Sequence, residues 1–350
     1  MTWIIAARRS PVAPSGGALA GLLPHELAAP VIRAALADAG IAPDQVDEVI
    51  LSNALGGGGN PARMAALAAG LPERVAGLSI DRQCVGGLDA ILLADALVRA
   101  GARIVVAGGA ESHSRRPHRL TRPGGVEYDR PAFAPFPARD PDMAEAAARL
   151  AAQMGHDRAA LDAYAVASHA KARAQPQSGL VPLAGLDRDA FTRALTPALA
   201  ARARAIHGPI SAANAAVSAD GAAFVVVSRD PIGPRPVKLL GGVTLGAAPE
   251  DPGLAPLAAI AALGPQRLDR IELMEAFAAQ ALATIEKAGF DPGLVNVKGG
   301  ALARGHPIGA SGSVLAVSLY HGLNGLGPGA LGLAAIAAAG GLGTALLLRA

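Results

Sequence analysis

The chain has 350 residues, which is enough for two ordinary domains or one large one. Its net charge is only +3 and it contains no long run of Lys and Arg, so nucleic-acid binding is not expected. The single cysteine excludes an intramolecular disulfide and fits a reducing compartment, the cytoplasm. We expect no secretory leader and no membrane-spanning helix, because glycines, prolines and charges interrupt the apolar runs, and the stretch 331–348 is rich in Gly and Ala.

The first hundred residues alternate short apolar runs with helical patterns. Residues 2–7, 46–51 and 103–107 are predicted strands. Residues 25–40 and 87–100 are predicted helices, and the first of them ends on a glycine. This alternation is typical of an α/β protein whose parallel or mixed sheet is covered by helices.

The chain changes character at about residue 117. From there to about residue 206 it contains a proline-rich loop, a long predicted helical run over 143–174 and further irregular sequence. We interpret this part as an insertion that lies over the α/β core. Strand-like sequence returns at 221–228, and the proline-dense residues 231–236 predict a linker to the second half.

The densest basic stretch lies among the prolines at the start of this insertion. It consists of Arg115, Arg116, His118, Arg119 and Arg122. No aromatic residues are interleaved with these side chains, so the stretch is not typical of a nucleic-acid site. Two interpretations remain open: a solvated or subunit-contact loop, and a contact to the phosphates of an anionic cofactor.

The second half of the chain repeats the first at an offset of 222 residues. Residues 46–51 match residues 268–273, and the same offset takes Cys84 to His306. Each of these two residues precedes a glycine-containing turn, an apolar helix and a strand that ends in a glycine pair. We interpret the pattern as an internal duplication. If the two copies pack about a pseudo-two-fold axis, Cys84 and His306 can meet in one pocket.

Cys84 lies at the beginning of a predicted helix that starts near Gly86. A helix N-terminus carries partial positive charge and free N–H groups, so we expect it to lower the pKa of the thiol and favour the nucleophilic thiolate. The alternative is a small buried hydrophobic residue, which is a common role for a single cysteine.

His306 lies in a glycine-dense segment, with five glycines among residues 299–312. A base with a pKa near neutrality could take the thiol proton there and later stabilise an oxyanion. The alternative is a hydrogen-bonded core histidine. His156 and His169 lie in helical sequence and are interpreted as structural, and no ligand pair has metal-binding spacing, so no metal is expected.

These motifs resemble the thiolase family, and the resemblance extends over essentially the whole chain. The segments that carry it are residues 49–55, 60–63, 82–88, 107–112 and 299–309. The resemblance implies an α/β fold with a duplicated five-layered α/β/α/β/α core and an inserted loop domain. It places the N-terminal half at residues 1–116 plus 208–231, the loop domain at 117–207 and the C-terminal half at 232–350. It also implies a homodimer or homotetramer.

The resemblance also implies a reaction with acyl-CoA, which would be a substrate, with no cofactor permanently bound. Cys84 would be the nucleophile that takes the acyl group, and His306 the base. The backbone N–H groups of Cys84 and Ala339 would form an oxyanion hole. A second acyl-CoA or free CoA would then complete condensation or thiolysis.

Three positions depart from the family pattern. Ala337 stands where the family has a second cysteine that moves the α-proton of the second acyl-CoA. Met274 replaces an Asn or His that holds a water at the enolate oxyanion, and a Met side chain cannot donate a hydrogen bond. Ala216 replaces a serine expected near CoA. Glu275 is adjacent to this site, but in the family it is structural.

We therefore predict a thiolase-like acyl-CoA acyltransferase that forms an acyl-cysteine intermediate and has an atypical second half-reaction. Acyl transfer to an acceptor other than carbon, or a decarboxylative condensation, would tolerate Ala337 and Met274. Two alternatives remain: a non-catalytic scaffold or partner subunit with the thiolase fold, and an ordinary acetyl-CoA C-acyltransferase in which another group replaces the missing base.

Overall fold

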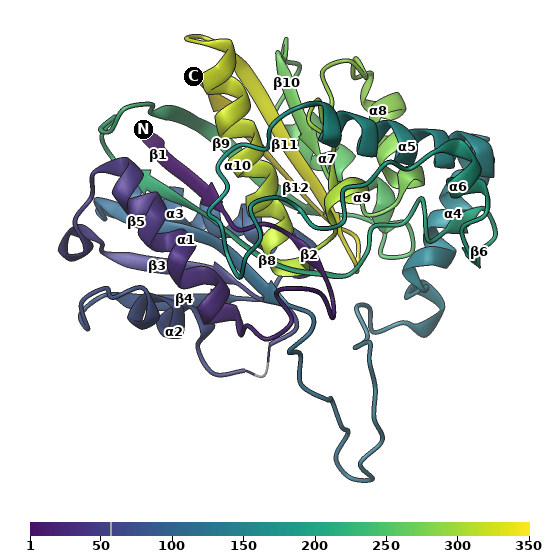
Figure 1. Cartoon of the computed structure of the whole chain (residues 1–350), viewed down its shortest axis with the longest axis horizontal. Coiled ribbons are helices and arrows are strands. Elements are labelled where there is room, and N and C mark those ends of the chain that lie inside the picture. Colours follow the sequence, from purple (N-terminus) through teal and green to yellow (C-terminus); the bar gives the residue numbers. More distant parts are fainter. Residues whose placement is uncertain (57) are drawn as a thin grey trace.

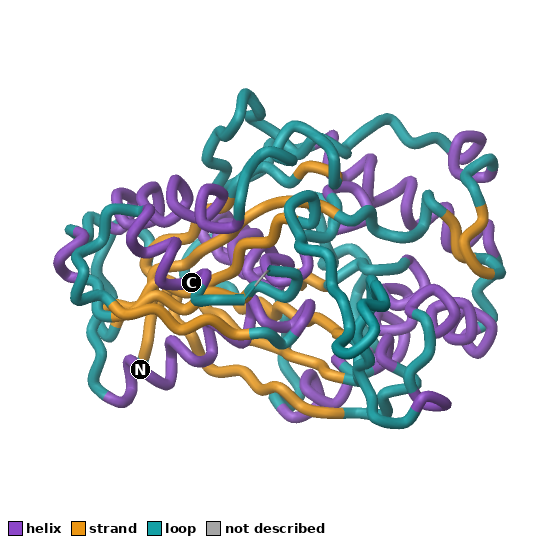
Figure 2. The backbone as a smooth tube through the Cα atoms, turned by 90° about the horizontal axis from the view of Figure 1, so that it is seen from below, coloured by secondary structure: helices purple, strands orange, loops and turns teal. Residues whose placement is uncertain are grey.

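The strands of this computed structural model, which describes residues 1–56 and 58–350, pair mainly into one large mixed sheet between helices (Figure 1, Figure 2). The strands of the first half are β1 (Thr2–Arg9), β2 (Ala13–Pro14), β3 (Glu48–Ser52), β4 (Ala76–Ile80), β5 (Ile104–Ser112) and β8 (Ala219–Ser228). Those of the second half are β9 (Val237–Gly246), β10 (Arg270–Leu273), β11 (Leu331–Ala338) and β12 (Leu342–Arg349).

Strand pairing confirms the predicted duplication. In the first half, β3 runs parallel to β5, β5 pairs antiparallel with β8, and β8 pairs antiparallel with β1. In the second half, β10 runs parallel to β11, β11 pairs antiparallel with β12, and β12 pairs antiparallel with β9. The two sets join through an antiparallel contact between β1 and β9, and β4 lies at the outer edge beside β3.

Five layers follow from the alternation of side chains along the strands. In β11, Ala334 and Ile336 face one core, while Leu333 and Ala335 face another. The helices α3 (Gly86–Ala100) and α10 (Ile308–Leu326) fill the middle layer between the two halves. The outer layers are α1 (Pro24–Ala39) with α2 (Pro61–Ala68), and α7 (Pro256–Ala262) with α8 (Ala278–Ala288).

The predicted helical run over 143–174 is confirmed in its bounds and consists of two helices. The helix α4 (Met143–Met154) ends at Gly155, whose φ of 72° lies in the left-handed region that favours glycine. Asp157 then caps α5 (Arg158–Ala174) by accepting a hydrogen bond from Ala160 N. Both helices pack with α8 in a separate apolar cluster. This part also contains α6 (Pro197–Ala201), β6 (Ala205–His207) and β7 (Ile210–Ser211).

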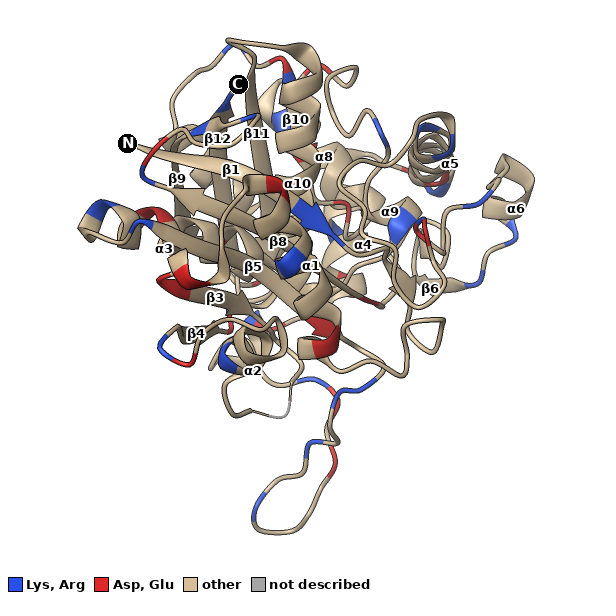
Figure 3. Cartoon of the chain, turned by 60° about the vertical axis from the view of Figure 1, so that its left-hand side comes forward, with Lys and Arg blue, Asp and Glu red and all other residues tan. Residues whose placement is uncertain are grey.

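A long loop connects β5 to α4. It extends away from the rest of the chain at the bottom of Figure 1, and Figure 3 shows that basic and acidic residues are interspersed along it. The predicted basic stretch divides there, because Arg115, His118 and Arg122 are exposed whereas Arg116 and Arg119 are partly buried.

The apolar C-terminal stretch forms strands. Within residues 331–348, all but the turn 339–341 belongs to β11 and β12, which are hydrogen-bonded to each other over their whole length. Among the helices that the structure describes, none is long and apolar enough to cross a membrane.

Glycines allow α3 and α10 to touch backbone to backbone near their N-termini. A Cβ atom on Gly87 would lie 2.5 Å from the backbone nitrogen of Ser313. A Cβ atom on Gly312 would lie 2.5 Å from the backbone nitrogen of Leu88. Both distances are shorter than real side chains show, so these positions accept only glycine without displacement of a helix.

We predict that Gly312→Ala lowers the free energy of unfolding by about 1–3 kcal/mol, because the new methyl group meets the backbone of α3. The control is Gly325→Ala near the end of the same helix, where no atom lies within 4 Å of the added Cβ. This control is expected to be neutral or stabilising by up to about 1 kcal/mol, because Ala favours helix. Urea denaturation measures both, and equal stabilities of the two variants would contradict the close contact.

Candidate active site

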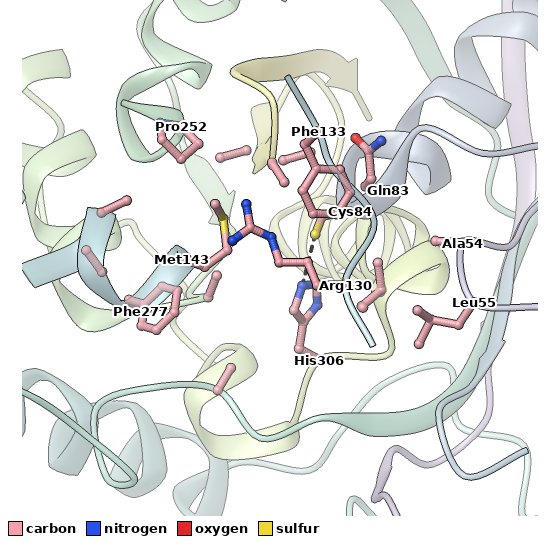
Figure 4. A pocket seen from close by; sticks show the side chains of 18 of the residues that line it. Ala54, Leu55, Gln83, Cys84, Arg130, Phe133, Met143, Pro252, Phe277 and His306 are labelled. Carbon is pink, nitrogen blue, oxygen red and sulfur yellow. Dashed lines mark hydrogen bonds between the residues drawn. The ribbon is translucent and has the colours of Figure 1, made fainter. Parts of the chain in front are cut away.

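Cys84 and His306 meet in the middle layer, as the duplication predicts. The Cys84 Sγ atom lies 3.1 Å from the His306 Nε2 atom (Figure 4). Cys84 belongs to the 3₁₀ turn Gln83–Val85 that leads directly into α3, and His306 precedes α10 by two residues. The contact between α3 and α10 therefore sets the distance between the two side chains.

Unusual backbone conformations present both side chains. Gln83 has a φ of 46°, which is strained for a residue with a side chain, and its N–H donates to Asp81 Oδ1 at 2.9 Å. Gly305 has a φ of 110°, and a Cβ there would lie 2.8 Å from the Ala219 side chain. The chain can therefore turn at Gly305 and expose the next residue, His306, to the thiol.

Hydrogen bonds determine which nitrogen of His306 carries the proton. The Ser311 hydroxyl donates to the Pro307 carbonyl oxygen at 3.1 Å. That hydroxyl lies 2.6 Å from His306 Nδ1, and since its own proton is used, it accepts from Nδ1–H. The Nε2 atom is then the unprotonated nitrogen, and its lone pair faces the thiol.

The predicted lowering of the thiol pKa was wrong. Burial raises the pKa of Cys84 to about 12, backbone hydrogen bonding at Cys84 lowers it by less, and the carboxylates of Glu111 and Asp81 raise it further. Burial, with a smaller effect of His113, lowers the pKa of His306 to about 4. The resting pair is therefore a neutral thiol beside a neutral imidazole, because an enclosed site disfavours both charged forms more than the helix end favours the thiolate.

A cavity of about 360 Å³ opens onto this pair. Its wall is mostly small or apolar, and the predicted positions Ala216, Ala337 and Ala339 all line it together with Cys84 and His306. No hydroxyl or thiol is therefore contributed by positions 216 and 337.

Met274 lies elsewhere than expected. It is 1% exposed and packs into the apolar core of the middle layer, whereas the cavity wall is formed by other residues of this segment, Ala276 and Phe277. An apolar side chain in this core needs no hydrogen-bond partner.

Glu275 has a structural environment. Its two carboxylate oxygens accept from the Tyr164 hydroxyl, Ser168 Oγ, Asn296 Nδ2 and Leu302 N at distances between 2.7 and 3.2 Å. The residue is 1% exposed. Both carboxylate oxygens accept hydrogen bonds from residues outside the cavity wall, so Glu275 is not available to a substrate. Its hydrogen bonds connect α5 to the segment before His306.

Sequence reasoning missed two residues at the end of β5. Glu111 is fully buried and accepts from the backbone N–H groups of Ala54, Leu55 and Gly309, and burial raises the pKa of its carboxyl to about 7. His113 lines the cavity. Both follow the Gly108-Gly109 pair, where the sequence predicted the end of the strand, whereas β5 continues to Ser112. The end of a strand beside the site was the signal that could have found them.

Other predicted residues separate into two groups. Arg116 and Arg119, but not the rest of the basic stretch, line the cavity.

His156 contacts Glu286 and His169 accepts from Arg193 N, so both have the structural roles that were expected. Within residues 1–56 and 58–350, no group of three or more His, Cys, Asp or Glu side chains could hold a metal ion.

The neutral pair predicts an unusual pH dependence of Cys84 alkylation. Between the pKa values of about 4 and about 12 the pair holds one shared proton, so the fraction present as thiolate and imidazolium is constant. We expect the rate of alkylation by iodoacetamide to be nearly flat from about pH 6 to about pH 9. In His306→Asn it should rise roughly tenfold per pH unit, because only free thiolate reacts. A flat profile in that variant would contradict the pairing.

Comparison with known proteins identifies the family. The chain matches the model of the thiolase N-terminal domain over residues 2–230 and that of the thiolase C-terminal domain over residues 238–350. An acetyl-CoA acetyltransferase of Cupriavidus necator is 38% identical over 393 residues, which covers 99% of this chain and 98% of that protein.

Two crystal structures share the fold. The acetyl-CoA acetyltransferase of Bacillus anthracis superposes with a TM-score of 0.90 at 32% identity, covering 99% of this chain and 98% of the other. A thiolase of Ascaris suum in complex with coenzyme A also gives a TM-score of 0.90, at 30% identity and 99% coverage of both chains. The chain, with its duplicated core and its paired Cys84 and His306, belongs to the thiolase family of acyltransferases.

Proposed function

We propose that this acyltransferase takes an acyl group from acyl-CoA onto Cys84 and passes it to a second substrate. The observation that carries the proposal is the contact of 3.1 Å between Cys84 Sγ and the unprotonated Nε2 of His306. A neutral thiol needs a base at the moment of attack, and this is the geometry that general-base catalysis requires.

The first half-reaction conserves one proton on the pair. Cys84 Sγ attacks the thioester carbonyl carbon while its proton moves to His306 Nε2. The carbonyl oxygen becomes an oxyanion, for which the N–H groups of Cys84 and Ala339 are the proposed donors. The bond from carbon to the CoA sulfur then breaks, and Nε2 returns its proton to the departing thiolate.

The walls of the cavity support acyl-CoA as the substrate class. Its interior is largely apolar, which suits an acyl chain, while Arg116 and Arg119 at the same cavity suit the phosphates of CoA. The relatives named as acetyl-CoA acetyltransferases favour a short acyl group.

The second half-reaction differs from the family pattern in its proton transfer. Forming or breaking a carbon–carbon bond moves a proton at the α-carbon of the second acyl-CoA, and the methyl group of Ala337 cannot carry it. An acceptor with an S–H, O–H or N–H group has no such need, because His306 Nε2 lies beside the acyl carbon and can take that proton.

We predict that incubation with acetyl-CoA adds one acetyl group to Cys84, detectable by mass spectrometry of the intact protein and of its peptides. Cys84→Ala should show no adduct, and His306→Asn should acylate roughly 10²–10⁴-fold more slowly. Absence of an adduct on the wild-type chain would overturn the proposal and favour the scaffold alternative.

We further propose that two chains associate through the open edge of β4. All five residues of this edge strand are partly or fully exposed, and Leu78 is 42% exposed. Met64 and Leu67 of the adjacent α2 are 48% and 47% exposed, so an apolar surface borders unpaired backbone groups.

Sedimentation velocity is expected to give twice the 34.8 kDa of one chain, or a multiple of that dimer. Leu78→Asp should shift the protein toward monomer, because a charge would be buried in the contact. The control, Leu326→Asp, changes a residue that is 50% exposed at the end of α10 and should leave the mass unchanged. A monomeric wild-type protein would refute this assembly.

A further inference from the structure

A second histidine lies in the active-site cavity. His113 follows the last residue of β5 and lines the same cavity of about 360 Å³ as Cys84, His306 and Ala337. Its side chain is partly buried. The first half-reaction does not use this histidine. Because position 337 has no thiol, the α-proton of the second acyl-CoA lacks the acid–base group that the family pattern would supply.

A chain of hydrogen bonds leads from His113 to a buried carboxylate. His113 Nδ1 lies 3.3 Å from Ser15 Oγ, which lies 3.4 Å from Ser114 Oγ, which lies 2.5 Å from Asp220 Oδ2. Asp220 is fully buried on β8, and its other oxygen accepts from Ser114 N at 2.9 Å. The carboxylate is thus fixed by the sheet.

The direction of each bond follows from the carboxylate end. A carboxylate only accepts, so Ser114 O–H donates to Asp220. Ser114 Oγ can then only accept, so Ser15 O–H donates to it, and His113 Nδ1–H in turn donates to Ser15. The remaining nitrogen of His113, Nε2, is therefore unprotonated. His306 acquires the same tautomer from Ser311 and Pro307.

We propose that His113 is the acid–base residue of the second half-reaction, in place of the family's second cysteine. This inference rests on the proposed function, because it assigns the proton carrier for a carbon acceptor at the acylated Cys84. The chain would then carry out ordinary condensation and thiolysis with two histidines and one cysteine.

His113 Nε2 takes a proton from the α-carbon of the second acyl-CoA, and the released electron pair forms a bond to the acyl carbon on Cys84. The carbon–sulfur bond to Cys84 breaks, and Sγ takes up a proton from solvent through His306 Nε2, which is unprotonated after the first half-reaction. His113 releases its proton to solvent. In thiolysis each step is reversed.

The other titratable side chains of the cavity are less suited. Asp129 is ion-paired with Arg116 at 2.8 Å, and Asp81 is exposed and accepts from Gln83 N. His306 is engaged by the thiol. Burial, and then the positive charge of Arg116, lower the pKa of His113, against a smaller opposite effect of Asp220 and Asp129, so its base form persists at neutral pH.

The test separates the two half-reactions in the full-length protein. Exchange of isotopically labelled CoA into acetyl-CoA requires only acyl transfer through Cys84 and His306. Thiolysis of acetoacetyl-CoA, and uptake of deuterium from D₂O into the methyl group of acetyl-CoA, also require a proton carrier at the α-carbon. We compare the wild type with His113→Gln, which keeps a hydrogen-bond donor for Ser15 but has no basic nitrogen.

In His113→Gln we expect the rates of thiolysis and deuterium uptake to fall roughly 10²–10⁴-fold. The rate of CoA exchange should stay within about threefold of wild type, which would also show that the site is folded. The control His118→Gln, on an exposed histidine outside the cavity, should leave all three unchanged. Thiolysis near the wild-type rate in His113→Gln, or an equal loss of exchange and thiolysis, would overturn the inference. Absence of CoA exchange in the wild type would instead refute the proposed function itself.

Discussion

The active site depends on a contact between two helices whose backbones approach closely at glycines. Gly87 of α3 and Gly312 of α10 allow the two backbones to approach within a distance that a single methyl group would block. Gly109 within β5 allows a similar approach, since a Cβ there would lie 2.2 Å from the carbonyl oxygen of Gly309. The duplicated halves are therefore held at their pseudo-symmetric centre by main-chain contacts, and Cys84 and His306 face each other as a consequence.

Burial at this helix contact also determines the protonation states of Cys84 and His306. Cys84 and His306 are only partly exposed, and their burial disfavours the charged forms, so the thiol keeps its proton and the imidazole stays unprotonated. Ser311 and the Pro307 carbonyl fix the tautomer, so that the unprotonated Nε2 of His306 faces the thiol. In the proposed reaction, charge separation is then needed only in the transition state, where the proposed oxyanion donors would act. In this arrangement a base held beside the neutral thiol takes the place of a preformed thiolate.

Much of this architecture could be predicted from the sequence. An offset of 222 residues links Cys84 to His306, and short apolar runs and glycine pairs predicted the strands on either side, because these signals are local or repeat within the chain. The sign of the pKa shift at Cys84 could not be predicted, since it depends on how completely distant segments enclose the thiol. The chain of bonds from His113 to Asp220 was also invisible, because it joins Ser15, Ser114 and Asp220 from three separate parts of the sequence.

The neutral state of Cys84 has a consequence for its reactivity toward peroxide. Peroxide reacts with thiolates rather than thiols, so a cysteine whose pKa lies near 12 is a poor target for oxidation to sulfenic acid while the cavity is empty of substrate. Because Cys84 is the only cysteine in the chain, no neighbouring thiol can trap it in an intramolecular disulfide. Ala337 lines the same cavity as Cys84 and contributes no second sulfur that could be oxidised there.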